Sequence, residues 1–423
     1  MPNLTAEILP QLISRQMNGV DAGSGAVYPA YDGFSLINLP HSVCGWLGQP
    51  GIGAAPLASV YSAPLRDHYQ HVVVVLVDGL GLDLFQQFLE QNPWRQWLPN
   101  SILAPLTSIM PSTTSAALTS IWTGVSPAAH GILGYEMWLK EYGMIANMIL
   151  HSPAAFNGDA GGLLRAGFSP QQFLPVPTLG RHLSAHEVDV FALQPNAIAR
   201  SGLSTMLLGG AEVLSYRNLS DLWVTLDELL DKQRGKSTYA YVYWGDIDEL
   251  SHRFGPQNER VKLEFDTFSR TIHRFVTQHQ KQYRGNTLLV LLADHGQIST
   301  PLNPRYELRS HPALLEDLVM PPSGENRLAY FFLRPGREDH ARDYIERSWP
   351  DEFKMIPSET VLTAGLFGPG TPYTRVHERL GDWAVFPQGA AYLWWADKPN
   401  PLLGRHGGLS LQEMMVPFWA MEI

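Results

Sequence analysis

The stretch HVVVVLVDGLG, residues 71–81, decides the fold class of this 423-residue chain. Six of the seven residues before Asp78 are Val or Leu, which is typical of a strand buried on both faces of a parallel sheet. An Asp at the carboxyl end of such a strand lies where open α/β sheets bind their ligands. The alternative is that Asp78 caps a helix over residues 82–90.

The same strand-then-polar pattern recurs twice. The run TLLVLLADHGQ, residues 287–297, ends in Asp294 and His295. In STYAYVYWGDIDELSH, residues 237–252, an aromatic strand precedes Asp248 and His252, which are four residues apart. This spacing puts both side chains on one face of a helix, as in a metal site, although such charged pairs are also common on helix surfaces.

Helical periodicity covers residues 219–232 and 259–283, and in the second helix we expect His273 and His279 to be solvated. Strands therefore alternate with helices along the chain. The sequence predicts an α/β fold with a doubly wound, mostly parallel sheet.

A third stretch, residues 101–135, connects a β-prone run to a helix-forming segment that Gly124 closes. The turn between them reads Pro-Ser-Thr-Thr. Hydroxyls at a helix start usually cap it. The alternative is that one of them is a nucleophile, held where the helix amides favour an anion. A Thr hydroxyl needs a base or a metal for that role.

Parallel strands bring their carboxyl ends to one edge of the sheet, so the polar residues of these turns should converge there. A Gly-flanked histidine near the C-terminus, in GRHGG, is expected to join them. The set is Asp78, Thr114, Asp248, His252, Asp294, His295 and His406. Three Asp, three His and a Thr suit two divalent metal ions, zinc first and manganese or iron as alternatives. Two metals ~4 Å apart can hold a phosphate between them.

Composition limits the classes of metal site, partner and cellular location that remain. The single cysteine, Cys44, excludes internal disulfides and thiolate-only zinc sites. A net charge of −10 disfavours a nucleic-acid polymer as partner. We find neither the pattern of a signal peptide nor an apolar run of ~18 residues, and expect a cytoplasmic protein without a membrane span. We expect a catalytic core with its N-terminal lead-in over residues 1–300, a small α+β insertion (a cap) over 301–400, and a return to the core over 401–423.

Six short motifs in this order resemble the alkaline phosphatase superfamily. They are VDGLG at Asp78, STTSAALTSIWTG over residues 112–124, AAHGI over 128–132, DELSH over 248–252, ADHG at Asp294 and RHGG at His406. Within the superfamily, the chain is similar to the nucleotide pyrophosphatase/phosphodiesterase family, also called type I phosphodiesterases. The histidine of AAHGI, His130, is expected to be structural.

The resemblance implies a role for each residue of the set. One metal would be bound by Asp248, His252 and His406. The other would be bound by Asp78, Asp294 and His295, together with the nucleophile. The family's nucleophilic Thr lies nine residues before the Thr of the closing Thr-Gly, here Thr123, which points to Thr114 and leaves Thr113 as the rival.

The implied activity is hydrolysis of a small phosphate ester, most simply a phosphodiester or nucleotide, through a phosphothreonine intermediate. One departure concerns Ala117, which stands where the family's phosphodiesterases have an Asn that donates to phosphate. Asn147 is a candidate replacement donor. The alternatives are a phosphomonoesterase or phosphonate hydrolase on the same site, and a non-catalytic metal-stabilised binding module. A sulfatase is disfavoured because the chain lacks Cys-x-Pro-x-Arg.

Overall fold

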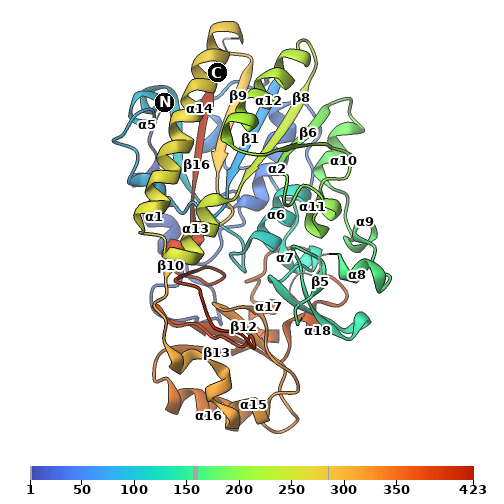
Figure 1. Ribbon diagram of the computed structural model, residues 1–423, viewed down its shortest axis with the longest axis vertical. Coiled ribbons are helices and arrows are strands. Elements are labelled where there is room, and N and C mark those ends of the chain that lie inside the picture. The colour runs from blue at the N-terminus through green and yellow to red at the C-terminus, as the bar shows by residue number, and fades with distance from the viewer. Residues whose placement is uncertain (1, 156–160, 284) are drawn as a thin grey trace.

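The computed structural model describes residues 2–155, 161–283 and 285–423, and it contains two large sheets that lie one beyond the other along the long axis (Figure 1). Both termini lie at the end farther from the second sheet. Within the described residues, no helix combines the length and the apolar composition that crossing a bilayer requires.

The first sheet has seven strands in the order β2-β16-β9-β1-β8-β6-β7. Their bounds are β1 His71–Val77, β2 Ser101–Thr107, β6 Asp189–Pro195, β7 Glu212–Tyr216, β8 Thr238–Trp244, β9 Thr287–Leu292 and β16 Met415–Glu422. Strands β9, β1, β8, β6 and β7 run parallel, whereas β16 is antiparallel to both of its neighbours. The predicted α/β fold with a mostly parallel sheet is confirmed.

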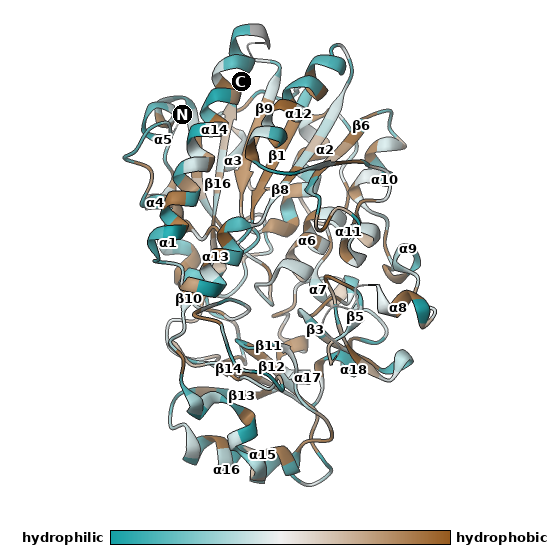
Figure 2. Cartoon of the chain, viewed as in Figure 1, coloured by the Kyte–Doolittle hydropathy of each residue, from teal (hydrophilic) through white to brown (hydrophobic). Residues whose placement is uncertain are grey.

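Helices cover both faces of this sheet, which explains the continuous apolar strands. Every residue of β1, β2, β8 and β9 is buried, and the Val- and Leu-rich strand β1 is brown in Figure 2. One group of helices consists of α12 Leu219–Lys232, α13 Asp246–Phe254 and α14 Glu259–Tyr283. The other consists of α2 Leu39–Trp46, α6 Thr114–Thr123, α10 Leu179–Ser184 and α11 Gly202–Leu207.

The second sheet combines strands from two distant parts of the sequence, in the order β13-β14-β12-β11-β3-β4-β5. The segment 301–400 supplies β11 Ser323–Glu325, β12 Leu328–Phe331, β13 Phe353–Pro357 and β14 Trp383–Pro387. The segment after α6 supplies β3 Glu136–Leu139, β4 Met144–Asn147 and β5 Ser152–Pro153. Gly324 pairs with Glu136 where the two halves meet. The sheet is therefore shared between the expected insertion and the core segment that follows α6.

Short helices flank this second sheet, with α15 Pro312–Asp317 and α16 Glu338–Ser348 at the far end of the molecule (Figure 1). Helices α17 Ser358–Thr363 and α18 Val376–Leu380 complete this subdomain. Between the two large sheets lies a two-stranded ribbon of β10 Ile298–Ser299 and β15 Gly404–Arg405.

One alternative is excluded and one expectation is wrong. Asp78 does not cap a helix, because α4 spans only Leu82–Gln86, has Gly81 at its N-cap position and carries no side-chain cap. His279 is buried rather than solvated, and its Nε2 lies 3.0 Å from Thr287 Oγ1. The amphipathic pattern of α14 did not show that β9 packs beside its last turns.

We expect Phe265→Ala to lower the free energy of unfolding by about 3–5 kcal/mol, because its buried ring packs against Phe85, Phe88 and Trp94 and truncation leaves a cavity. Leu263→Ala, on the exposed face of the same helix, should change it by about 0.5 kcal/mol or less. Urea unfolding of both variants measures the difference. Equal losses would contradict the packing described here.

Candidate metal centre

The candidate ligands lie at the carboxyl ends of adjacent parallel strands. Asp78 follows β1, Asp294 and His295 follow β9, and α13 begins two residues after β8 ends. Gly79 has a φ of 73°, and a Cβ there would lie 3.0 Å from the Cα of Asp248. A side chain at Gly79 would therefore obstruct the close approach of the β1 turn to α13.

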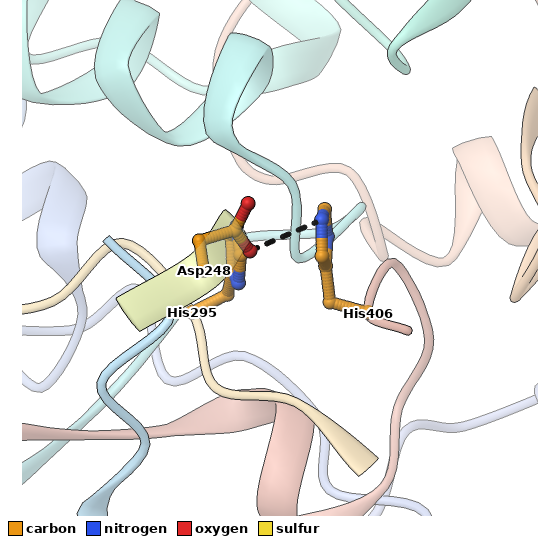
Figure 3. Close-up of side chains that lie close together, drawn as sticks. All are labelled: Asp248, His295 and His406. Carbon is orange, nitrogen blue, oxygen red and sulfur yellow. Dashed lines mark ion pairs between the residues drawn. The ribbon is translucent and has the colours of Figure 1, made fainter. Parts of the chain in front are cut away.

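Two groups of three potential ligand atoms result, and the atoms of each group lie within 4.8 Å of one another. In the first, His295 Nε2 is 3.4 Å from Asp78 Oδ1 and 3.5 Å from Asp294 Oδ2. In the second, His406 Nε2 is 3.8 Å from Asp248 Oδ1, and the His406 and His295 rings stack with centroids 3.7 Å apart (Figure 3). His295 belongs to both groups.

Backbone carbonyls orient the other two histidines. His252 Nδ1 lies 2.9 Å from the carbonyl oxygen of Gly404, and His406 Nδ1 lies 3.0 Å from that of Ser112. A carbonyl only accepts, so each Nδ1 carries a proton, and each Nε2 is the ring nitrogen turned toward the cluster. His252 Nε2 is 3.4 Å from Asp248 Oδ2. His252 thus borders the second group, and the predicted division of ligands between two metals stays a prediction.

Thr114 is the hydroxyl residue that faces this cluster. Its Oγ1 lies 3.1 Å from His295 Nε2 and 3.4 Å from Asp78 Oδ2. Thr113 occupies the N-cap position of α6, but no side-chain cap forms there, and its side chain interacts with Glu325 instead. Thr113 therefore does not cap α6 through its side chain, and within the described residues the first amides of α6 have no side-chain cap.

The electrostatics of the cluster fit divalent cations. Asp78 Oδ1 and Asp294 Oδ2 are buried and accept no hydrogen bond from any described residue. Burial raises the pKa of Asp78 well above its usual value, and the Asp294 and Asp248 charges raise it further. Burial, and then the neighbouring His295 and His252, lowers the pKa of His406 well below its usual value. Unpaired carboxylate oxygens beside imidazole nitrogens are the donor set that a metal requires.

Three residues that the sequence analysis did not select support the cluster. The Tyr243 hydroxyl, at the end of β8, donates to Asp78 Oδ2, and the Gln297 side-chain amide donates to Asp248 Oδ1. Glu325 accepts a hydrogen bond from the Tyr135 backbone N–H at 2.5 Å. Gln297 directly follows the ADHG motif, and Tyr243 lies in the strand that precedes the DELSH motif. Their nearness to these motifs is a signal by which sequence reasoning could have found them. Glu325 comes from the second sheet, and nothing in its local sequence signals the contact.

Three further predicted positions are also placed. Asn147 Oδ1 accepts from the backbone N–H groups of Ile149 and Leu150, both at 2.9 Å, so its carbonyl stabilises a turn. Its role as a phosphate donor stays a prediction. His130 is buried between Ser120 Oγ and the Ile132 N–H, which is consistent with a structural role. Ala117 is fully buried.

We compared the chain with known proteins. A family model described as type I phosphodiesterase / nucleotide pyrophosphatase matches residues 72–358. The chain belongs to this family. It is thus an enzyme of a metal-dependent phosphodiesterase and pyrophosphatase family within the alkaline phosphatase superfamily. No curated protein has a significant sequence match to the chain.

Solved structures share the fold at low sequence identity. Murine ectonucleotide pyrophosphatase/phosphodiesterase 5 is 15% identical with a TM-score of 0.61, over 83% of this chain and 87% of that one. An inactive threonine-to-alanine variant of the murine protein, in complex with AMP, aligns with a TM-score of 0.60 at the same identity and coverage. Phosphonoacetate hydrolase from Sinorhizobium meliloti, in complex with phosphonoformate, is 17% identical with a TM-score of 0.59, over 82% of this chain and 89% of that one.

We expect Glu325→Gln to stabilise the metal-free protein at alkaline pH. Burial raises the pKa of Glu325 from 4.5 to about 8. The native state therefore retains a proton that the unfolded state releases above pH 4.5, so stability is lost as the pH rises through 8. Chemical unfolding at pH 5 and pH 8.5 should show little difference at the lower pH and a more stable variant at the higher pH.

The matched control is Glu346→Gln, an exposed position on α16 in the same subdomain. Its unfolding free energy should follow that of the unaltered protein at both pH values. A Glu325→Gln protein with the same pH dependence as the unaltered chain would show that this carboxyl is not destabilised by burial.

Proposed function

We propose that this enzyme hydrolyses small phosphate esters, phosphodiesters and nucleotides first among them, through attack of Thr114 Oγ on phosphorus. The observation that carries the proposal is the position of Thr114. Its hydroxyl lies at the N-terminus of the ten-residue helix α6 and within 3.4 Å of Asp78 and His295. This position places a base or metal next to the hydroxyl. It also places backbone amides where they can bind the phosphate.

We further propose that two divalent ions, zinc before manganese or iron, are the resident cofactors. Asp78, Asp294 and His295 would hold one, and Asp248, His252 and His406 the other. When bound, such ions lower the pKa of a coordinated hydroxyl and neutralise charge on the phosphate oxygens. The Tyr243 hydroxyl, by donating to Asp78, fixes the carboxylate beside the nucleophile.

The reaction has two steps. First, the Oγ–P bond to Thr114 forms as the P–O bond to the leaving alcohol breaks, and the departing oxygen takes up a proton. Water then adds to the phosphothreonine, and Thr114 leaves with its proton restored. The N–H groups of the first turn of α6 are the proposed donors to the phosphate oxygens, in place of the Asn that Ala117 replaces.

Substrate preference is the finer part of the proposal. The murine structural relative is described in complex with AMP, which motivates nucleotides. Phe331 is buried in the hydrophobic cluster of the 301–400 segment, and Trp394 is buried with its indole N–H donating to the Lys398 carbonyl, so these two rings do not stack on a base. The second candidate is a phosphomonoesterase or phosphonate hydrolase. Ala117 favours it, since a side-chain donor to phosphate is absent at that position.

The test compares initial rates on bis-p-nitrophenyl phosphate, p-nitrophenyl phosphate and phosphonoacetate, using metal-free protein reloaded with zinc or manganese. We expect the diester to be hydrolysed fastest. Thr114→Ala should lose at least about 10³-fold in kcat, as removal of a nucleophile does, while still binding metal. Thr113→Ala is the matched control and should retain activity.

A faster rate on the monoester or on phosphonoacetate would replace the diester proposal with the second candidate. Activity that survives in Thr114→Ala and disappears in Thr113→Ala would move the nucleophile by one residue. If no variant and no metal gave turnover, the chain would be a binding module.

A further inference from the structure

The ribbon of β10 and β15 holds one half of the metal centre together. Ile298 pairs with Arg405 and Ser299 with Gly404, and His406 follows directly. The ribbon also grips α13, because the Leu403 N–H donates to the His252 carbonyl at 2.8 Å and His252 Nδ1 donates to the Gly404 carbonyl. Two histidines of the centre therefore depend on the same short ribbon.

Arg405 fastens the ribbon to the second subdomain. Its guanidinium lies 3.7 Å from the centre of the Tyr392 ring. It also donates to Thr300 Oγ1 and to Asn400 Oδ1, both at 2.6 Å. These contacts make the ribbon a rigid support rather than a free loop.

Gln297, the residue just before β10, reaches from this support to Asp248. Its Nε2 donates to the Asp248 backbone oxygen at 3.1 Å and to the Asp248 carboxylate through Oδ1. Both partners of Nε2 can only accept, so the orientation of the amide follows from chemistry. Gln297 is 4% exposed, and a buried double contact of this kind fixes the rotamer of the carboxylate.

Gln297 packs so closely against residue 404 that only a glycine fits there. A Cβ at Gly404 would lie 2.6 Å from Gln297 Oε1 and 2.3 Å from the Ser251 carbonyl oxygen. The absence of a side chain at Gly404 therefore lets the ribbon, α13 and the Gln297 amide meet. Oε1 itself accepts no hydrogen bond from the described residues. The amide therefore acts on Asp248 through its donor nitrogen, Nε2.

We propose that Gln297 is a positioning residue that fixes the orientation of the Asp248 carboxylate and thereby sets the affinity of one of the two metal sites. The proposal rests on the proposed two-metal function. The amide donates to Oδ1, the oxygen that lies 3.8 Å from His406 Nε2, and it leaves Oδ2 beside His252 Nε2, at 3.4 Å. Residues that orient metal ligands in this way typically contribute 10- to 100-fold in metal affinity.

Gln297 also connects the two metal sites. It follows His295 by two residues in the chain and contacts Asp248 through space. Loss of the amide should nevertheless act on one site. Among the described residues, Asp78, Asp294 and His295 make no hydrogen bond with Gln297, and they are held by Tyr243, Gly79 and the backbone of their own loop.

The experiment titrates zinc into the metal-free protein by calorimetry, without substrate. The unaltered chain should show two binding events. In Gln297→Met, which keeps the size and removes the donor, one dissociation constant should rise 10- to 100-fold and the other should change less than about 3-fold. Ser299→Ala, at an exposed position of β10, is the matched control and should leave both constants unchanged.

A double-mutant cycle separates positioning from general loosening. In Asp248→Asn the same site is already weakened, so adding Gln297→Met should cause little further loss. If Gln297→Met does not fold, Gln297→Asn, whose amide is one methylene too short to reach Asp248, should give the same selective loss. Equal weakening of both sites, unchanged constants, or full additivity with Asp248→Asn would each overturn the proposal.

The result of the zinc titration does not depend on whether the protein hydrolyses phosphate esters. Because the titration contains no substrate, a chain that binds two metals but hydrolyses no phosphodiester would refute the proposed function and leave the role of Gln297 intact. An active enzyme with two unchanged metal constants in Gln297→Met would refute only the role of Gln297.

Discussion

Three carboxylates brought together at one edge of a sheet, two of them buried and that of Asp248 partly exposed, are the constraint on which the rest of this structure depends. The parallel pairing of β1 with β8 and β9 forces Asp78, Asp248 and Asp294 to the same place. Their ion-pair partners among the described residues are histidines. Buried charges of one sign are costly unless cations or protons compensate them. The proposed nucleophile Thr114, the first amides of α6 and the ribbon of β10 and β15 all lie around these carboxylates.

The local sequence predicted the elements that impose this constraint. Apolar runs such as residues 72–77 identified strands buried on both faces, and each was followed at once by its polar residue. Helices α12 and α14 have the predicted bounds, because their apolar stripes repeat at helical spacing. Parallel topology then placed Asp78, Asp294 and His295 together without any knowledge of long-range contacts.

What the sequence did not predict depends on pairing between distant segments. Glu325 reaches the nucleophile turn only because β11 pairs with β3. Gln297 contacts Asp248 only because the ribbon packs on α13. His279 is buried because β9 lies beside the end of α14. Local periodicity contains no information about contacts between distant segments. The residues that support the centre were therefore harder to predict than its candidate ligands.

The measurement that tests the account most directly is anomalous diffraction from crystals of the zinc-loaded protein. The account predicts two peaks, one among Asp78, Asp294 and His295 and one among Asp248, His252 and His406, with the Thr114 hydroxyl beside the first. In Asp294→Asn the first peak should weaken more than the second. A single peak, or metal bound elsewhere while these carboxylates remain unoccupied, would contradict it.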